Sequence, residues 1–253
     1  MKIDGTSALV TGAGSGLGEA TARHLASLGA RVAVLDRDAD RATQVAGEID
    51  GEAVVGDVAD DAAMAAVFAG LAQGQGSPRI VVNCAGIGTA GRIVGREAPL
   101  PLGDFEKVIR VNLTGTFNIM RLAAAAMQAL DPKDDAERGV IINTASVAAF
   151  EGQIGQAAYS ASKGGIVSMT LPAAREFARF GVRVNVIAPG IFLTPLLRSL
   201  PEEVQISLAQ DIPFPSRLGD PSEFADAVRF CIENRYLNGE TIRLDGGTRL
   251  KAK

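Results

Sequence analysis

The residues best suited to proton-transfer chemistry are Tyr159 and Lys163, which stand four positions apart in the sequence. Residues i and i+4 share one face of a helix, so the Lys163 ammonium can reach the Tyr159 ring. A nearby cation favours the phenolate and lowers a pKa that starts near ~10. A phenol with such a pKa can serve as an acid or a base close to neutral pH. The only histidine, His24, falls in the first predicted helix, beside a glycine-rich loop, and is a poorer candidate.

The elements that must position this pair alternate along the chain as short apolar runs and helical patterns. The predicted strands are 8–11, 32–35, 53–56, 80–83, 140–143, 182–187 and 241–244, and the predicted helices are 17–28, 39–48, 61–73, 104–130, 157–180 and 222–234. Short continuous apolar runs suit strands that are buried on both faces. The alternation predicts an α/β fold with a Rossmann-type doubly wound parallel sheet of about seven strands, in one domain spanning 1–253.

The amino-acid composition limits the class of protein to which this chain can belong and the partners that it can bind. Apolar residues make up 47% of the 253 residues and aromatic residues only 5%, with 29 glycines and no tryptophan. The net charge of −4 comes without a basic run, which argues against nucleic acid or an anionic membrane surface as a partner. Two cysteines are too few for a disulfide framework, and no metal-ligand cluster surrounds them. We expect a reducing, cytoplasmic location, no targeting peptide and no membrane span.

A glycine-rich segment between the first strand and the first helix predicts a nucleotide site. It reads Thr11-Gly12-Ala13-Gly14-Ser15-Gly16-Leu17-Gly18. Glycines allow a tight turn and close approach to a pyrophosphate, and the following helix supplies N–H groups and a positive dipole end. A strand before the loop and a helix after it are the context that such a motif needs. Gly12, Ser15, Gly16, Leu17 and Gly18 are the predicted cofactor contacts.

The second predicted strand leads into Asp36, where a carboxylate can accept hydrogen bonds from the adenosine ribose and repel a 2′-phosphate. Arg37 next to it is the kind of residue that binds such a phosphate. We favour NAD over NADP because the carboxylate stands at the strand end itself. Asp57, with Val58, follows the third strand and either reaches the adenine or caps the next helix.

Two long loops, 86–103 and 189–221, follow strands and are the predicted walls of the substrate site, although irregular surface loops remain an alternative. Ligands of such sheets bind beyond the carboxyl ends of the strands. The second loop contains Phe192 and Leu196 in an apolar stretch that suits an acyl chain or a steroid. The alternative is that these side chains only pack the loop against the core.

The motifs together resemble the short-chain dehydrogenase/reductase family over essentially the whole chain. The matching positions are the glycine loop, Asn83-Cys84-Ala85-Gly86, Asn112, Ser146, Tyr159 and Lys163. One departure is Cys84, where many members carry a second asparagine. This resemblance implies a nicotinamide cofactor, contacted also by Cys84, Ala85, Gly86 and by Pro189, Gly190 and Thr194.

The same resemblance implies a role for each catalytic residue. Tyr159 is the general base in alcohol oxidation and the acid in ketone reduction. Lys163 holds the nicotinamide ribose and lowers the Tyr159 pKa, while Ser146 hydrogen-bonds the substrate oxygen as an oxyanion donor does. Asn112 anchors a water chain that passes protons to Lys163; on its residue type alone it is equally an ordinary helix asparagine.

Within the family, the second half resembles the type 2 3-hydroxyacyl-CoA dehydrogenases. The similar segments are 139–153, Met169-Thr170-Leu171-Pro172, 213–221 and Leu237-Asn238-Gly239-Glu240. Pro172 is informative, since proline inside a helix costs ~3 kcal/mol or more. Gln153 and Gln156 are candidates to bond a thioester carbonyl, although Gln156 also suits a helix's first turn. Arg92, Arg96 and Arg198 are candidates to bind the phosphates of coenzyme A.

The resemblance implies an NAD-dependent enzyme that interconverts 3-hydroxyacyl-CoA and 3-oxoacyl-CoA. Alternatives in the same class are a secondary-alcohol or hydroxysteroid dehydrogenase and a 3-oxoacyl thioester reductase. A different class, a non-catalytic scaffold that binds the cofactor, is possible on the same fold, but it has no need of Ser146, Tyr159 and Lys163 together. Family members commonly form homotetramers, and the run 123–126 of four alanines either faces another subunit or faces the sheet.

Overall fold

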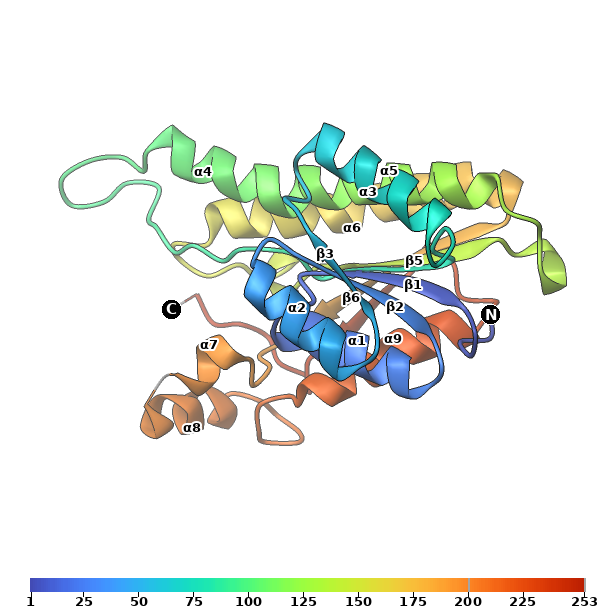
Figure 1. Ribbon diagram of the computed structural model, residues 1–253. Coiled ribbons are helices and arrows are strands. Elements are labelled where there is room, and N and C mark those ends of the chain that lie inside the picture. Colours follow the sequence, from blue (N-terminus) through green and yellow to red (C-terminus); the bar gives the residue numbers. More distant parts are fainter. Residues whose placement is uncertain (200, 253) are drawn as a thin grey trace.

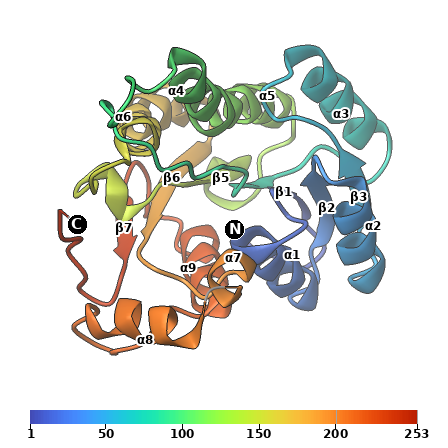
Figure 2. The same cartoon turned by 90° about the vertical axis from the view of Figure 1, so that its left-hand side faces the viewer.

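A computed structural model describes residues 1–199 and 201–252 of the chain, together with all of their side chains except that of Leu196. Its centre is one parallel sheet of seven strands in the order β3-β2-β1-β4-β5-β6-β7 (Figure 2). The strands are β1 (Ser7–Thr11), β2 (Arg31–Asp36), β3 (Glu52–Val55), β4 (Ile80–Asn83), β5 (Gly139–Thr144), β6 (Val182–Pro189) and β7 (Thr241–Leu244). The parallel sheet and its strand positions confirm the predicted fold class.

Helices cover both faces of the sheet, as Figure 1 shows. One layer contains α1 (Gly16–Ser27), α2 (Ala39–Glu48) and α9 (Pro221–Glu233), and the other contains α3 (Asp61–Gln73), α4 (Leu102–Val108), α5 (Gly115–Gln128) and α6 (Ala157–Phe177). Each layer forms its own apolar core against the sheet, because alternate strand side chains point to opposite faces. The first core includes Leu25 and Phe224, and the second includes Met64 and Ile119.

Two predicted elements differ from the observed ones. The predicted helix 104–130 is interrupted by a π-helix, η1 (Ile109–Thr114), which separates α4 from α5. The second long loop contains two short helices, α7 (Pro195–Arg198) and α8 (Glu202–Gln210), which lie beyond the carboxyl ends of the strands (Figure 2). Three 3₁₀ turns, η2 (Asp134–Ala136), η3 (Val147–Ala149) and η4 (Ala178–Phe180), complete the helical elements of the described residues.

The alanine run near the end of α5 faces inward. Ala123 and Ala124 are buried in the core between α5 and the sheet, whereas Ala125 is exposed. The sequence left open whether this run faces the sheet or another subunit. Its first two residues pack against the sheet.

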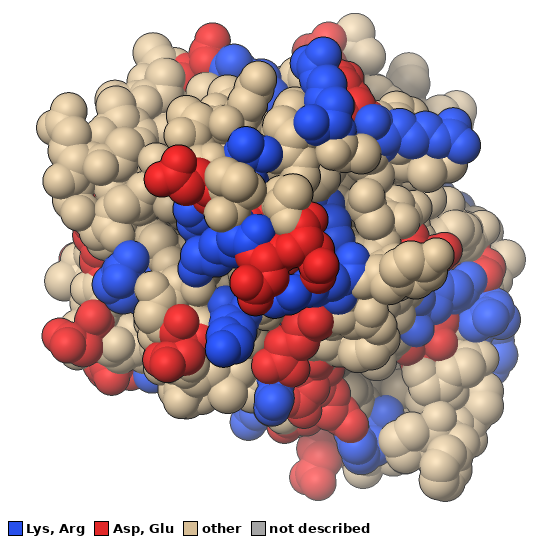
Figure 3. Space-filling model, turned by 90° about the vertical axis from the view of Figure 1, so that its right-hand side faces the viewer, with Lys and Arg blue, Asp and Glu red and all other residues tan. Residues whose placement is uncertain are grey.

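Charges are mixed at the amino ends of the strands. Figure 3 shows acidic and basic side chains side by side on this face, without a continuous basic area. Arg235 pairs with Asp134 and Asp135 at 3.0 and 2.9 Å, and the buried Arg183 donates to Glu137 at 2.9 Å. This end of the sheet is thus fixed by ion pairs.

Across the described residues, the helices are too short or too polar for any of them to cross a bilayer. No group of three or more His, Cys, Asp and Glu side chains in that part of the chain is arranged to hold a metal ion.

Candidate active site

The glycine loop forms a cradle that has no space for side chains. Gly12 has φ +63°, and a Cβ there would lie 2.8 Å from the backbone of Ala85. A Cβ on Gly18 would collide with the carbonyl oxygen of Gly12. Ser15 precedes α1 in an extended conformation, and its side chain makes no capping hydrogen bond. The N–H groups at the start of α1 therefore remain available for an anionic group such as a pyrophosphate.

Asp36 lies at the end of β2 with its carboxylate turned to the same loop. Its oxygens accept hydrogen bonds from the backbone N–H of Gly14 at 2.9 Å and of Asp38 at 3.0 Å. A Cβ on Gly14 would lie 2.9 Å from the Asp36 carboxylate and 2.8 Å from Cβ of Arg41. Arg41 therefore borders the loop, and its guanidinium pairs with Asp38 at 3.4 Å. Sequence reasoning missed Arg41, because it belongs to α2 and stands at no motif position.

Asp57 lies in the turn between β3 and α3, and it does not cap that helix. Helix α3 is capped by Asp60, whose carboxylate accepts from the N–H of Ala63 at 3.0 Å. Asp57 instead accepts from the N–H of Ala59 at 2.9 Å and stabilises the turn before α3. The helix N-cap interpretation of Asp57 is therefore wrong. Val58 is buried, and its carbonyl accepts from Asn118 at 2.9 Å.

Tyr159 and Lys163 lie one turn apart on α6, as their spacing predicted. Nζ of Lys163 is 5.7 Å from the centroid of the Tyr159 ring and donates to the carbonyl of Thr144 at 2.8 Å. Ser146 follows β5, and its hydroxyl accepts from the N–H of Ala148 at 3.1 Å, which begins the turn η3. The Ser146 side chain also hydrogen-bonds with that of Tyr159. The structure thus brings Ser146, Tyr159 and Lys163 together.

Burial shifts the pKa values of both Tyr159 and Lys163. Burial raises the pKa of Tyr159, and its hydrogen bond with Ser146 offsets only part of that rise. The expected lowering of the Tyr159 pKa is therefore wrong for this structure, because loss of water around the phenol outweighs its neighbours. Burial also lowers the pKa of Lys163 to about 8, since the ammonium is only 4% exposed.

Asn112 is placed by the π-helix. Its side chain is fully buried, and its Oδ1 accepts from the N–H of Ile87 at 2.8 Å. Its Nδ2 donates to the carbonyl of Ile87 at 2.9 Å and to the hydroxyl of Ser162 at 3.0 Å. Single π-turns inserted in a helix are often found at functional sites. Asn112 therefore ties the first long loop to the helix that holds Tyr159 and Lys163.

The segment after β4 lies between the glycine loop and Lys163. The N–H of Ala85 donates to the hydroxyl of Thr11 at 3.1 Å, and a Cβ on Gly86 would lie 3.6 Å from Nζ of Lys163. Burial raises the pKa of the Cys84 thiol to about 11, so this thiol is protonated at neutral pH. Cys84 packs here as a small neutral side chain.

The end of β6 and the loop that follows close the other side of the cradle. Gly190 donates its N–H to the carbonyl of Leu244 at 2.9 Å, and a Cβ there would lie 2.9 Å from Asp245. Thr194 lies over the glycine loop, since a Cβ on Gly16 would be 3.6 Å from its methyl group. Thr194 therefore borders the glycine loop, while Gly190 packs against β7 and Asp245.

The predicted substrate residues have different surroundings. Gln153 lines a hollow of about 570 Å³ and donates to the carbonyl of Lys251 at 3.1 Å, while the Gln156 side chain accepts from the N–H of Gln153 at 3.0 Å. Phe192 is only 6% exposed and packs edge-on against Phe224, with ring centroids 6.3 Å apart. Phe192 packs in the core and also lines a second hollow, with Ile212 and Arg217, so its role as a substrate contact stays a prediction. The side chain of Leu196 lies outside the described residues.

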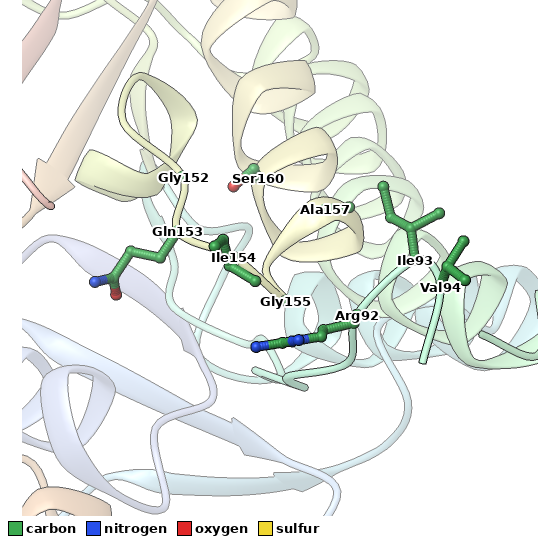
Figure 4. Close-up of a pocket in the computed structure, with 9 residues that line it drawn as sticks. All are labelled: Arg92, Ile93, Val94, Gly152, Gln153, Ile154, Gly155, Ala157 and Ser160. Atoms are coloured by element: carbon green, nitrogen blue, oxygen red, sulfur yellow. The ribbon is translucent and has the colours of Figure 1, made fainter. Parts of the chain in front are cut away.

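The hollow is formed by the first long loop and the turn before α6, as Figure 4 shows. Its apolar side chains are Ile93, Val94 and Ile154, each more than half exposed. Arg92 reaches across one side of it. Ser160, which follows Tyr159 on α6, lines the hollow, whereas Ser146, Tyr159 and Lys163 are not among its lining residues.

The arrangement fits a nicotinamide dinucleotide. A glycine cradle without space for side chains, a helix start with free N–H groups and a carboxylate at the end of β2 suit the pyrophosphate and adenosine ribose. In that fit, Lys163 and the segments 84–86 and 189–194 would hold the nicotinamide end. Tyr159 and Ser146 would then be the residues next to a reacting oxygen.

Comparison with known proteins agrees with this geometry. The family described as short chain dehydrogenase matches residues 6–205. The 3-hydroxyacyl-CoA dehydrogenase type-2 of Bos taurus is 50% identical over 98% of this chain and 97% of its own length, and that of Drosophila melanogaster is 49% identical over 96% of each. The crystal structure of 3-hydroxyacyl-CoA dehydrogenase type-2 from Mycobacterium avium superposes with a TM-score of 0.94 and 43% identity, covering 98% of both chains. The chain belongs to the short-chain dehydrogenase family.

Proposed function

We propose that this chain is an NAD-dependent 3-hydroxyacyl-CoA dehydrogenase, which interconverts 3-hydroxyacyl-CoA and 3-oxoacyl-CoA. The observation that carries the proposal is the group of Ser146, Tyr159 and Lys163 beside an apolar hollow, in a chain about half identical to enzymes of that name. A scaffold that only binds the cofactor would have no use for this group.

In the proposed reaction, Tyr159 takes the proton of the substrate 3-hydroxyl during oxidation and returns it during reduction. A nicotinamide cofactor held by the glycine loop and Lys163 would supply the hydride to the substrate C3, or accept it from that carbon. Ser146 holds the substrate oxygen and stabilises its developing negative charge. Lys163 is held by the carbonyl of Thr144, which directs its amine toward the Tyr159 ring.

The thioester substrate is supported by the walls of the hollow. Ile93, Val94 and Ile154 give it apolar sides suited to an acyl or pantetheine chain. Arg92 is the one of the three candidate arginines that lines it, and within the described residues no carboxylate pairs with Arg92. By contrast, Arg198 lies on α7 and donates to the carbonyl of Leu193 at 3.4 Å. We assign Arg92 to the phosphates of coenzyme A, because an unpaired guanidinium suits such anions.

The preference for NAD is supported by Asp36. Its carboxylate is fixed by two backbone N–H groups and stands beside the glycine loop, where a 2′-phosphate would be repelled. Arg37 follows it in sequence, and Arg41 pairs with Asp38 rather than with Asp36. We propose that the carboxylate dominates, because it sits at the strand end itself.

We further propose a homotetramer in the cytoplasm. Exposed apolar side chains on one helical layer support assembly: Leu102 on α4, Phe117 on α5 and Leu171 on α6 are 69%, 51% and 43% exposed. The free cysteines Cys84 and Cys231 support a reducing compartment.

The proposal is tested by oxidation of NADH with acetoacetyl-CoA, with NADPH run in parallel. We expect turnover with NADH and much less with NADPH. We expect the Tyr159→Phe variant to lose turnover by at least about 100-fold, the lower end of the range for a lost acid or base, and to keep NADH binding measured by fluorescence. Full activity of that variant would remove Tyr159 as the proton-transfer group. An inactive wild type that still binds NADH would redirect the search to free alcohols and steroids.

A further inference from the structure

Arg243, on the edge strand β7, holds three separate segments together. Its Nη1 and Nη2 donate to the two carboxylate oxygens of Glu151 at 2.7 and 2.8 Å. Its Nε donates to Asp245 at 2.8 Å, and Nη2 also reaches the carbonyl of Thr248 at 3.2 Å. A fork-shaped pair of bonds of this kind fixes orientation as well as distance. We call Glu151, Arg243 and Asp245 the Arg243 cluster.

The first segment held by this cluster is the link between Ser146 and Tyr159. Glu151 follows the turn η3, where its N–H donates to the carbonyl of Val147 at 3.0 Å. Phe150 lies under the guanidinium, with Cζ of Arg243 5.1 Å from the ring centroid. Because Ser146 begins this turn, the position of Glu151 is transmitted to the Ser146 hydroxyl through only a few residues.

The second segment is the end of β6. Ala188 of β6 pairs in register with Arg243 of β7, and Gly190 donates its N–H to Leu244. A Cβ on Gly190 would lie 2.9 Å from both Cα and Cβ of Asp245, so these two residues are in direct contact. In Figure 2, β7 lies at the sheet edge beside β6. The loop that adjoins the proposed nicotinamide position thus rests on the same cluster.

The third segment is 248–252, which closes over the link. Arg249 reaches Asp245 at 3.2 Å and Glu151 at 3.5 Å. The carbonyls of Lys251 and Ala252 accept from the Gln153 side chain and from the N–H of Ile154, both at 3.1 Å. This segment therefore holds the turn before Tyr159 from its outer side.

We propose that the Arg243 cluster is a positioning device that fixes the substrate side of the active site, Ser146 to Tyr159, relative to its cofactor side, Pro189 and Gly190. The inference rests on the proposed function, because hydride transfer needs both sides in one geometry. Glu151 and Arg243 are positioning residues, since neither faces the reacting atoms. The cluster suits this role because its charges are largely withdrawn from water: Asp245 is 8% exposed, Arg243 23% and Glu151 26%.

The test is the Glu151→Gln variant, which keeps the side chain's size and removes its charge and one acceptor. We expect kcat for acetoacetyl-CoA reduction to fall about 10- to 100-fold, as small misplacements near reacting atoms do. We expect KM for NADH to stay within about twofold, because the cradle at 12–18 is untouched. The isotope effect on kcat with NADH deuterated at the transferred position is expected to rise, since hydride transfer becomes the slow step. A merely structural loss would lower the amount of folded enzyme and leave that isotope effect unchanged.

The matched control is Asp135→Asn, which also changes a carboxylate on an arginine to an amide, but at the amino ends of the strands. Asp135 has φ 56° and contacts Arg235 at 2.9 Å, and asparagine tolerates that backbone conformation well. We expect this variant to keep the kcat and isotope effect of the wild type.

A second measurement separates this inference from the proposed function. Amide hydrogen exchange needs no substrate, and we expect Glu151→Gln to speed exchange in 147–156 and in 188–191 together. Loosening confined to 147–156, or unchanged kcat in an active wild-type background, would overturn the positioning role. A wild type without activity would overturn only the proposed function. The amide exchange rates of 147–156 and 188–191 would then decide whether the cluster couples these two segments.

Discussion

At the scale of single residues, Asp36 decides how the cradle treats the two nicotinamide dinucleotides. Its carboxylate is oriented by the N–H groups of Gly14 and Asp38, so it cannot readily turn away from a 2′-phosphate. We expect Asp36→Ala to lower the ratio of kcat/KM for NADH over NADPH about 10- to 100-fold, the range for a lost hydrogen bond to a charged group. The control is Asp40→Ala, which removes an exposed carboxylate from the first turn of α2 and should leave the ratio unchanged. An unchanged ratio in Asp36→Ala would remove this residue as the selector.

Lys163 carries a cost in stability that depends on pH. Its pKa falls from 10.5 to about 8 on burial, so the folded chain releases this proton before the unfolded chain does. Wild-type stability therefore rises as pH increases from about 8 to 10.5. At neutral pH the buried charge of Lys163 lowers the free energy of unfolding by up to about 3 kcal/mol, and its hydrogen bond to Thr144 raises it by about 1 kcal/mol.

We expect Lys163→Met to raise the free energy of unfolding by about 2 kcal/mol at pH 7, from the difference of these two contributions. The gain should shrink through the window in which wild-type lysine loses its proton. Urea unfolding at pH 7 and at pH 10 measures both quantities. A pH-independent difference between the two proteins would contradict the assignment of the cost to a buried ammonium.

At the scale of elements, α6 combines the proton-transfer pair with a proline in its interior. Pro172 is exposed, so it removes a helical hydrogen bond without evident gain in packing. We expect Pro172→Ala to raise the free energy of unfolding by about 1–2 kcal/mol, because the helix gains more than the unfolded chain does. Turnover should not change, since Tyr159 and Lys163 lie more than two turns away. A less stable variant would show that α6 depends on the backbone restriction of proline.

The strands and the Tyr159/Lys163 pair could be predicted from the sequence, whereas the π-helix could not. Strands buried on both faces have a strong apolar signal, and the pair Tyr159/Lys163 follows directly from helix geometry. The π-helix at Asn112 has no such signal, because one extra residue in a turn is stabilised by tertiary bonds to Ile87 and Ser162. The surroundings of Phe192 could not be predicted, because an apolar loop residue can pack against the core, line a hollow, or do both, as Phe192 does. The raised pKa of Tyr159 depends on its burial, which spacing does not encode.

At the scale of the whole molecule, the proposed assembly depends on the layer of α4, α5 and α6. Phe117 on α5 is 51% exposed, and with Leu102 on α4 and Leu171 on α6 it gives this layer exposed apolar surface that would suit a contact between subunits. We expect light scattering to give four times the chain mass for the wild type. The Phe117→Asp variant should give a smaller mass, because a carboxylate in an apolar interface is strongly unfavourable.

The control for assembly is Val55→Asp on the edge strand β3, where the valine is also about half exposed, at 52%. We expect this variant to keep the mass of the wild type. A wild-type chain that stays monomeric at micromolar concentration would refute the assembly.

The strand order has a consequence for how the chain is made. Strands β1 to β4 occupy one continuous block of the sheet, β3-β2-β1-β4, and β5, β6 and β7 then extend it outward in their order of synthesis. A growing chain can therefore pair its first four strands early, and each later strand meets an edge that already exists. The glycine loop and Asp36 belong to the early block, whereas Tyr159 follows that block and the Arg243 cluster is completed only with β7. We expect a ribosome-bound chain to recognise the dinucleotide well before it can carry out chemistry on a substrate.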